Sequence, residues 1–331
     1  MKVQPDLVSI IRDIAKPFAI PEYVHDWQHR AAKLSAISDL YSIKIKENPF
    51  LEDIDIHKSF ISLPPLREAI KESFNRAYNH SKINYAFDYG CLSGWQYDAY
   101  EKLYGDVDAS EKIVISACAY AICNLSMPLE IMLALCNLLY EEALHLEATN
   151  TLLGTDQSIK PWIPDDKKTN WQLICETKSI TSYLFIEHCL YEGRGFLAAA
   201  KAAYDLAQNR IDSVICEIEK GIFQQETNHL LTGYFWLKQL DVGDSDEELK
   251  NTLRSFLEKE PIASIDSFRG KKHRFPMFLV ANYLKNRSFW RIKETVIENA
   301  KSCFLTGLPL VTDERLLEAT EEVAKWCGYG F

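Results

Sequence analysis

The sequence predicts an all-α protein with a core of four long helices and further helices on both sides of that core. Apolar residues recur at helical spacing through the middle of the chain, prolines are almost absent there, and no stretch alternates apolar and polar residues as a strand does. The four predicted core helices lie in residues 108–125, 128–153, 169–207 and 211–240.

Residues 1–107 and 241–331 flank this core. The first flank is interrupted by prolines and predicts short helices, such as residues 7–15 and 66–78, that wrap over the core. The second flank predicts shorter helices that are separated by breaking residues, namely Pro261, Pro276, Gly307 and Pro309. We expect one compact unit overall.

Local signals mark the ends of the core helices. Asp108 can cap the first helix, and Pro128 suits the first turn of the second. Gly154 can end the second helix, and Asn209-Arg210 provides a break between the third and the fourth. The first and second helices are therefore expected to form one antiparallel hairpin, and the third and fourth helices another.

Composition narrows the class of protein. The formal charge is −10 and the pI about 5.4, which argues against a nucleic-acid partner because such proteins usually carry a basic excess. The nine cysteines include no C-x-x-C pair, a pattern typical of reduced thiols in a cytoplasmic protein. The N-terminus has no signal-peptide pattern, and no apolar run is long enough to span a membrane.

Two Glu-x-x-His motifs fall on predicted core helices. Glu142 and His145 lie on the second helix, and Glu226 and His229 on the fourth. Residues three apart share one helical face, so each pair can present a carboxylate and an imidazole to one point. One such motif is expected by chance from composition, and we assign that role to the copy at Glu22 in the proline-rich flank.

Hairpin geometry adds a carboxylate to each motif. Folding the first two helices about residues 126–128 brings Glu111 level with Glu142, and folding the last two about Asn209 brings Glu192 level with Glu226. Four carboxylates and two imidazoles that converge in a bundle suit two divalent first-row metal ions, iron or manganese. Without a metal, they would form a costly cluster of buried like charges.

Several of these residues have alternative roles. Glu111 also fits a capping box that begins at Asp108. Glu187 competes with Glu192, although five residues place it on a different face of an α-helix. His188 shares the face of Glu192 and could be a further ligand or a core histidine, while Gln225 could orient an imidazole.

At these residues the sequence resembles the ferritin-like carboxylate-bridged di-iron superfamily. The resemblance consists of Glu111, then Glu142 and His145, repeated as Glu192, then Glu226 and His229, and it covers about residues 108–240. It is nearest to an uncharacterised bacterial subfamily allied to a tRNA-modifying di-iron monooxygenase. It implies a ferritin-like four-helix bundle, two iron ions and dioxygen as co-substrate.

Departures from the superfamily patterns narrow the function. Thr149 stands where the radical-generating members place a tyrosine, and storage ferritins lack such long additions to the bundle. We therefore expect an O₂-activating di-iron oxidase or oxygenase that acts on a small organic molecule and uses an electron donor. Hydroxylation, N-oxygenation and desaturation stay open, as does a homodimer. The alternatives are a non-catalytic iron-handling or storage protein and a tRNA-modifying monooxygenase.

A cationic segment is a candidate site for a substrate anion. Arg269, Lys271, Lys272 and Arg274 lie within six residues and could receive a carboxylate or a phosphate, or they could form a solvated loop between helices. Arg194, between two glycines and close to Glu192, could pair with a ligand carboxylate or with the substrate.

Overall fold

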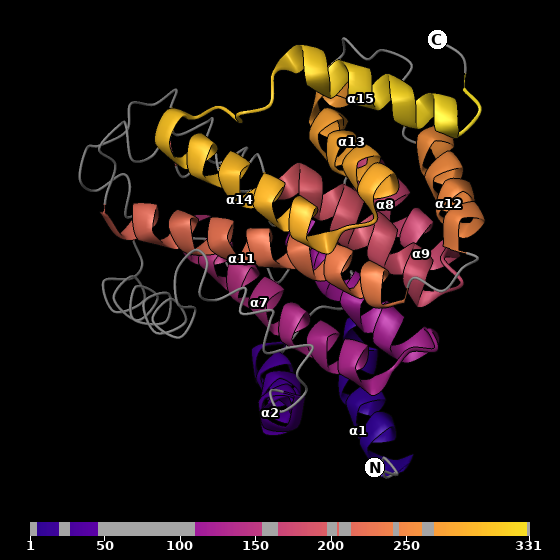
Figure 1. The fold of residues 1–331 in the computed structure, drawn as a ribbon. Coiled ribbons are helices and arrows are strands. Elements are labelled where there is room, and N and C mark those ends of the chain that lie inside the picture. The colour runs from indigo at the N-terminus through magenta and orange to yellow at the C-terminus, as the bar shows by residue number, and fades with distance from the viewer. Residues whose placement is uncertain are drawn as a thin grey trace. The chain divides into compact units, whose positions relative to one another are not determined.

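The computed structural model confirms an all-α protein, because every regular element among the residues that it describes is helical (Figure 1). The described residues are 5–19, 27–45, 110–153, 165–196, 204, 213–240, 245–259 and 268–329. Asp108, Gly154, Asn209 and the predicted helix at residues 66–78 lie outside them.

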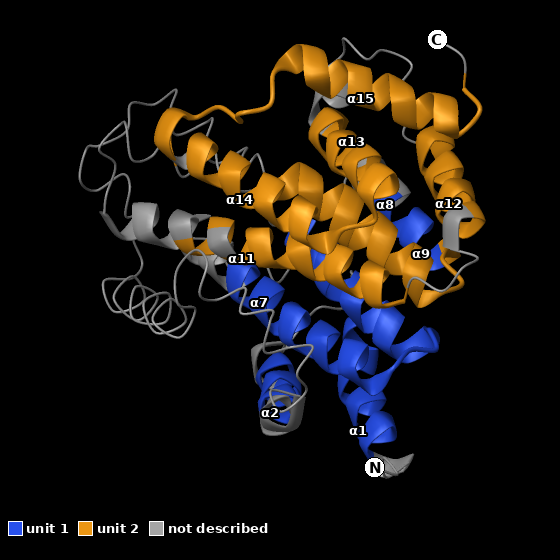
Figure 2. Ribbon diagram, viewed as in Figure 1, with its two compact units in different colours: residues 1–175, 211–218 blue, residues 176–210, 219–331 orange. Residues whose placement is uncertain are grey.

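The chain divides into two compact units (Figure 2). The first comprises residues 1–175 and 211–218, and the second comprises residues 176–210 and 219–331. These divisions run through the third and fourth predicted core helices and do not follow the expected boundaries at residues 107 and 240. Each unit is therefore described by itself.

The helices of the first unit are α1 (Pro5–Ala15), η1 (Lys16–Phe18), α2 (Trp27–Ile45), a helix that covers residues 110–124, α7 (Leu129–Leu153) and most of α8 (Asp165–Glu176). The turn between the two central helices covers residues 125–128, as predicted. Helix α2 packs along α7, and the Ser38 hydroxyl donates to the Leu133 carbonyl at 3.0 Å.

Arg12 ties α1 to the helix at residues 110–124. Its Nε donates to the Ile122 carbonyl at 3.1 Å and its Nη2 to the Leu125 carbonyl at 3.4 Å. The last carbonyls of a helix have no partner within it, so a guanidinium at this end satisfies them and is favoured by the helix dipole. This contact fixes the helix end from which the turn into α7 begins.

The elements of the second unit are α9 (Ile180–Leu184), η4 (Phe185–Tyr191), a helical continuation to residue 196, α11 (Ser213–Gln239) from residue 219 onwards, α12 (Ser245–Lys259), α13 (Phe268–Asn286), α14 (Phe289–Thr306) and α15 (Asp313–Trp326). Gly307, with φ of 73°, ends α14 as predicted, because its left-handed conformation favours glycine.

The prediction of one helix over residues 169–207 was wrong, because residues 177–179 interrupt it between α8 and α9. Ser179 is extended (φ −133°, ψ 157°), and its hydroxyl accepts from the Ser182 N–H at 3.0 Å. A serine that bonds its own backbone in this way offers an alternative to the helix interior and starts a new helix. Glu248 on α12 strengthens the break by accepting hydrogen bonds from the hydroxyls of both serines.

The prediction that Pro276 breaks a helix was also wrong, since Pro276 lies inside α13. Proline in a helix interior costs about 3 kcal/mol, so tertiary packing must offset it. Its neighbours Phe275 and Met277 are buried, and the proline ring packs against Gly193, where a β-carbon would lie 3.3 Å from it.

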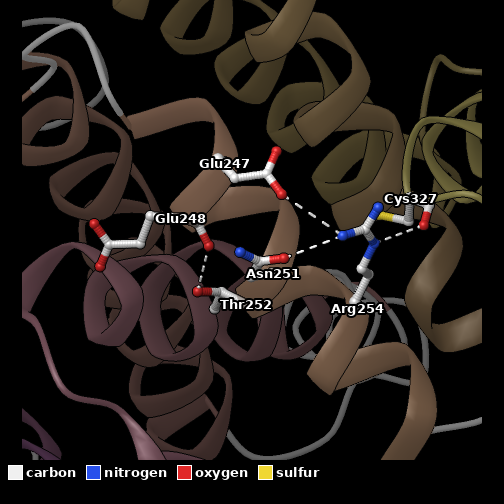
Figure 3. A network of polar contacts seen from close by, with 6 residues as sticks. All are labelled: Glu247, Glu248, Asn251, Thr252, Arg254 and Cys327. Carbon is white, nitrogen blue, oxygen red and sulfur yellow. Dashed lines mark hydrogen bonds and ion pairs between the residues drawn. The ribbon is translucent and has the colours of Figure 1, made fainter.

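Arg254 on α12 anchors the end of α15 (Figure 3). Its Nε donates to the Cys327 carbonyl at 2.8 Å, its Nη1 donates to Asn251 Oδ1 at 3.1 Å, and Glu247 Oε1 lies 3.7 Å from Nη1. The Cys327 carbonyl, at the C-terminal end of α15, thus receives a cationic donor from another helix. Among the helices that the structure describes, none is sufficiently long and apolar to cross a membrane.

Candidate metal centre

The first unit contains a buried triad made of Glu111, Glu142 and His145. Glu111 lies on the helix at residues 110–124, and the other two lie on α7. One ligand atom from each residue lies within 4.8 Å of those of the other two. His145 Nδ1 is 3.3 Å from Glu142 Oε2 and 3.7 Å from Glu111 Oε2. The hairpin geometry predicted from the sequence therefore does bring Glu111 to the Glu142–His145 pair.

The acidic and basic groups of this first triad shift one another's pKa. Burial raises the pKa of Glu111 well above its usual value, and the neighbouring Glu142 carboxylate raises it further. Burial lowers the pKa of His145, but Glu142 and Glu111 outweigh that effect, so the pKa of His145 is raised. Two carboxylates that face one imidazole out of water favour positive charge between them. A divalent cation supplies that charge more fully than one proton does.

The second unit contains a triad of the same composition, made of Glu192, Glu226 and His229. One ligand atom from each again lies within 4.8 Å of those of the other two. His229 Nδ1 is 4.0 Å from Glu192 Oε1. The exposed fractions of Glu192, Glu226 and His229 are only 5%, 7% and 0%.

The two triads share their chemistry. Each has two carboxylates and one imidazole that turns Nδ1 towards a carboxylate, and each is built from a Glu-x-x-His motif and one further Glu. Carboxylate oxygens with imidazole nitrogens suit iron and manganese among the common protein metals. The residues of both triads therefore fit a metal centre. The protein has buried groups of glutamate and histidine that could hold a metal ion.

Glu192 is held at the end of a π-helical segment. Its backbone N–H donates to the carbonyl of Glu187, five residues earlier, and the segment Phe185–Tyr191 has this wider turn throughout. Such segments are rare and are frequent at functional sites. The expectation that Glu187 and Glu192 lie on different faces assumed a regular α-helix, whereas this segment bonds five residues apart. Nothing in the sequence signals this segment.

Glu187 and His188 are buried in the π-helical segment, with exposed fractions of 1% and 0%. Neither belongs to a triad among the described residues. The His188 ring packs edge-on against Tyr183, with centroids 5.6 Å apart, and its backbone meets α11 at Gly233. Of the two glutamates weighed from the sequence, the structure groups Glu192 with Glu226 and His229.

The remaining candidate residues lie around these groups. Gln225, next to Glu226, is buried with an exposed fraction of 1%. Arg194 is half-buried, and its guanidinium carbon lies 5.1 Å from the centroid of the Tyr191 ring. Such a cation–π contact holds the guanidinium beside the aromatic face.

The cationic segment is helical rather than a loop, because α13 begins at Phe268. Arg274 is buried, with an exposed fraction of 6%, so the expectation of a solvated loop was wrong for this residue. The side chains of Arg269, Lys271 and Lys272 lie outside the described residues, as do the chance motif at Glu22 and the side chain of Thr149.

No protein-family model, no curated protein and no solved structure matches this chain. The ferritin-like bundle and membership of the di-iron superfamily therefore stay predictions, and they depend on the six triad residues and their spacing.

Proposed function

We propose that the two triads together bind two iron ions and that the protein is an O₂-activating oxidase or oxygenase of a small organic molecule. The observation that carries this proposal is the duplication of one buried donor set, two carboxylates and an imidazole, in both units.

Electrostatics supports a metal rather than a purely structural role for the triads. Moving a carboxylate out of water costs several kcal/mol, and two that face each other cost more. Glu142 is 1% exposed and lies beside Glu111, whose raised pKa reflects this environment. A structural core would be stabilised more simply by apolar residues of similar volume. The four glutamates of the triads are therefore best explained by cations that they bind.

The chain's own residues would have distinct tasks in such a centre. The glutamates would hold the ions, and His145 and His229 would each offer the Nδ1 lone pair. Bound ferrous iron supplies the electrons that reduce dioxygen for the oxidation of a C–H or N–H bond. The burial of all six residues would keep bulk water away from the ions.

Catalytic turnover distinguishes this proposal from the alternative of a storage protein. We expect the iron-loaded protein to consume dioxygen repeatedly in the presence of a reductant and a substrate, and to form oxidised product. A single burst of dioxygen uptake that stops once the iron is oxidised, with no product from any substrate, would support iron handling instead. The net charge of −10 argues against the tRNA-modifying alternative, which needs a surface for phosphates.

The control variants for this assay can be matched closely. Glu141→Ala changes a buried glutamate beside Glu142 that lies in neither described triad and accepts a hydrogen bond from Asn137. Glu142→Ala should abolish turnover, whereas Glu141→Ala should retain it. Equal turnover by both variants would refute the assignment of Glu142.

A further inference from the structure

Exposed apolar side chains concentrate on α14 and directly after it, in the second unit (Figure 2). Of the six large apolar side chains that are exposed among the described residues, four belong to this segment: Trp290, Leu305, Leu308 and Leu310. Their exposed fractions are 53%, 71%, 67% and 61%. Single exposed apolar residues need no explanation, whereas a group of them marks an interaction surface.

Trp290 and Leu305 are the two ends of one exposed stripe along α14. The exposed residues Glu294 and Lys301 lie between them, at spacings of four, seven and four residues. These spacings follow the α-helical period, so the four side chains share one face of the helix. The opposite face holds α14 on its unit through buried residues such as Val296, which is 0% exposed. The stripe is therefore not part of that packing.

The stripe is complementary to itself under a two-fold rotation. Trp290 and Leu305 have the same midpoint in the helix as Glu294 and Lys301, between residues 297 and 298. Two copies of α14 that pack antiparallel about this midpoint place the tryptophan of each copy against the leucine of the other. They also place each glutamate against a lysine. A symmetric dimer requires such a patch, because the same surface serves both partners.

We propose that two copies of this chain form an antiparallel, two-fold symmetric dimer through the stripe on α14. This inference goes beyond the proposed function, because no triad residue lies on α14. Leu308 and Leu310 extend the apolar surface past the end of α14, and the antiparallel arrangement brings that end to Trp290 of the other copy. The paired charges favour a second copy over an anionic membrane, which would repel Glu294 and Glu298.

The size of the stripe sets the expected strength of this dimer. The distance along α14 from Trp290 to Leu305 is about 22 Å at 1.5 Å per residue. Stable interfaces bury about 1,200–2,000 Å² in total, and a contact confined to one helix and the loop after it is small beside them. We therefore expect a dissociation constant in the micromolar range, so that the fraction of dimer rises with protein concentration.

Sedimentation velocity of the full chain, from about 1 μM to about 100 μM, tests the proposal. Glu294→Lys and Lys301→Glu should each weaken the dimer at least about tenfold, because each places like charges opposite each other twice. The double variant, Glu294→Lys with Lys301→Glu, restores both ion pairs and should recover the wild-type dissociation constant within about threefold. Glu318→Lys is the matched control, because it makes the same change at an exposed glutamate of α15, outside the stripe.

Leu305→Gln tests the apolar contact and should also weaken the dimer about tenfold. Urea midpoints equal to that of the wild type would show that these exposed substitutions leave folding unchanged. A wild type that stays monomeric at about 100 μM would overturn the proposal, as would a dimer that Leu305→Gln and both single charge reversals leave unchanged. If the single reversals weaken the dimer but the double variant does not restore it, the antiparallel pairing is wrong. Iron content is measured separately, so these outcomes leave the proposed function to its own test.

Discussion

Gly233 lies where α11 meets the π-helical segment, and replacing it by alanine tests that packing directly. The added β-carbon would lie 2.5 Å from His188 Cβ, 3.2 Å from Cys189 Sγ and 3.2 Å from the His188 carbonyl carbon. Carbon atoms in contact prefer about 3.5–4.0 Å, so the two elements must move apart by about 1 Å. Overpacking of this kind costs about 1–3 kcal/mol.

The backbone makes a smaller contribution to the free energy of unfolding, in the opposite direction. Alanine is favoured over glycine inside a helix by about 0.5–1 kcal/mol, so the net destabilisation should be up to about 2.5 kcal/mol, with a middle value of about 1 kcal/mol. Gly195→Ala provides the matched control, because the same chemical change there meets only an ordinary contact at 3.6 Å. That variant should be neutral, or more stable by up to about 1 kcal/mol.

Urea unfolding of the two metal-free variants measures this difference. Gly233→Ala should lower the unfolding midpoint without changing the slope, while Gly195→Ala should not lower it. Because Glu192 follows His188 by four residues, Gly233→Ala should also weaken iron binding. If both variants unfold at the same urea concentration and bind iron equally, the close packing of α11 on the π-helical segment is refuted.

Two further predictions follow from contacts outside the triads. Arg254→Met keeps the aliphatic stem but removes the hydrogen bond to the Cys327 carbonyl. It should lower the free energy of unfolding, measured in urea, by about 1 kcal/mol. A urea midpoint equal to that of the wild type would show that Arg254 does not anchor α15. Burial raises the pKa of Cys136 from its ordinary value of 9.0 to about 12, so the unfolded chain ionises first as the pH rises. The neutral Cys136 thiol therefore contributes fully to the free energy of unfolding below pH 9. Between pH 9 and pH 12 this contribution falls by about 1.4 kcal/mol per pH unit. Cys136→Ala should remove that part of the alkaline loss of stability, and an unchanged pH profile would contradict the burial of this thiol.

The sequence predicts most of the first unit's central hairpin because its signals are local. Pro128 marks the start of α7, and the short turn before it fixes which residues lie opposite each other. Equal distances from that turn then place Glu111 beside Glu142. The helical spacing of Glu142 and His145 needs only the α-helical period, which the sequence shows clearly.

The features that the sequence does not predict depend on tertiary contacts. The interruption at Ser179 is stabilised by Glu248, which is distant in the chain, and the α-helical path of Pro276 depends on Gly193. The π-helical segment has no residue pattern of its own, although it decides where Glu187 and Glu192 lie. Helix α2 was not predicted, because its apolar residues do not form a clear stripe, yet it packs on α7.

The iron content of the reconstituted protein tests the central claim most directly. After anaerobic loading and removal of loose metal, we predict about two iron ions per chain. Glu142→Ala and His229→Ala should each lose most of this iron. Glu141→Ala and His273→Ala, which change buried residues outside the two described triads, should retain it. Less than about one ion per chain in the wild type, or unchanged iron in Glu142→Ala and His229→Ala, would contradict the account.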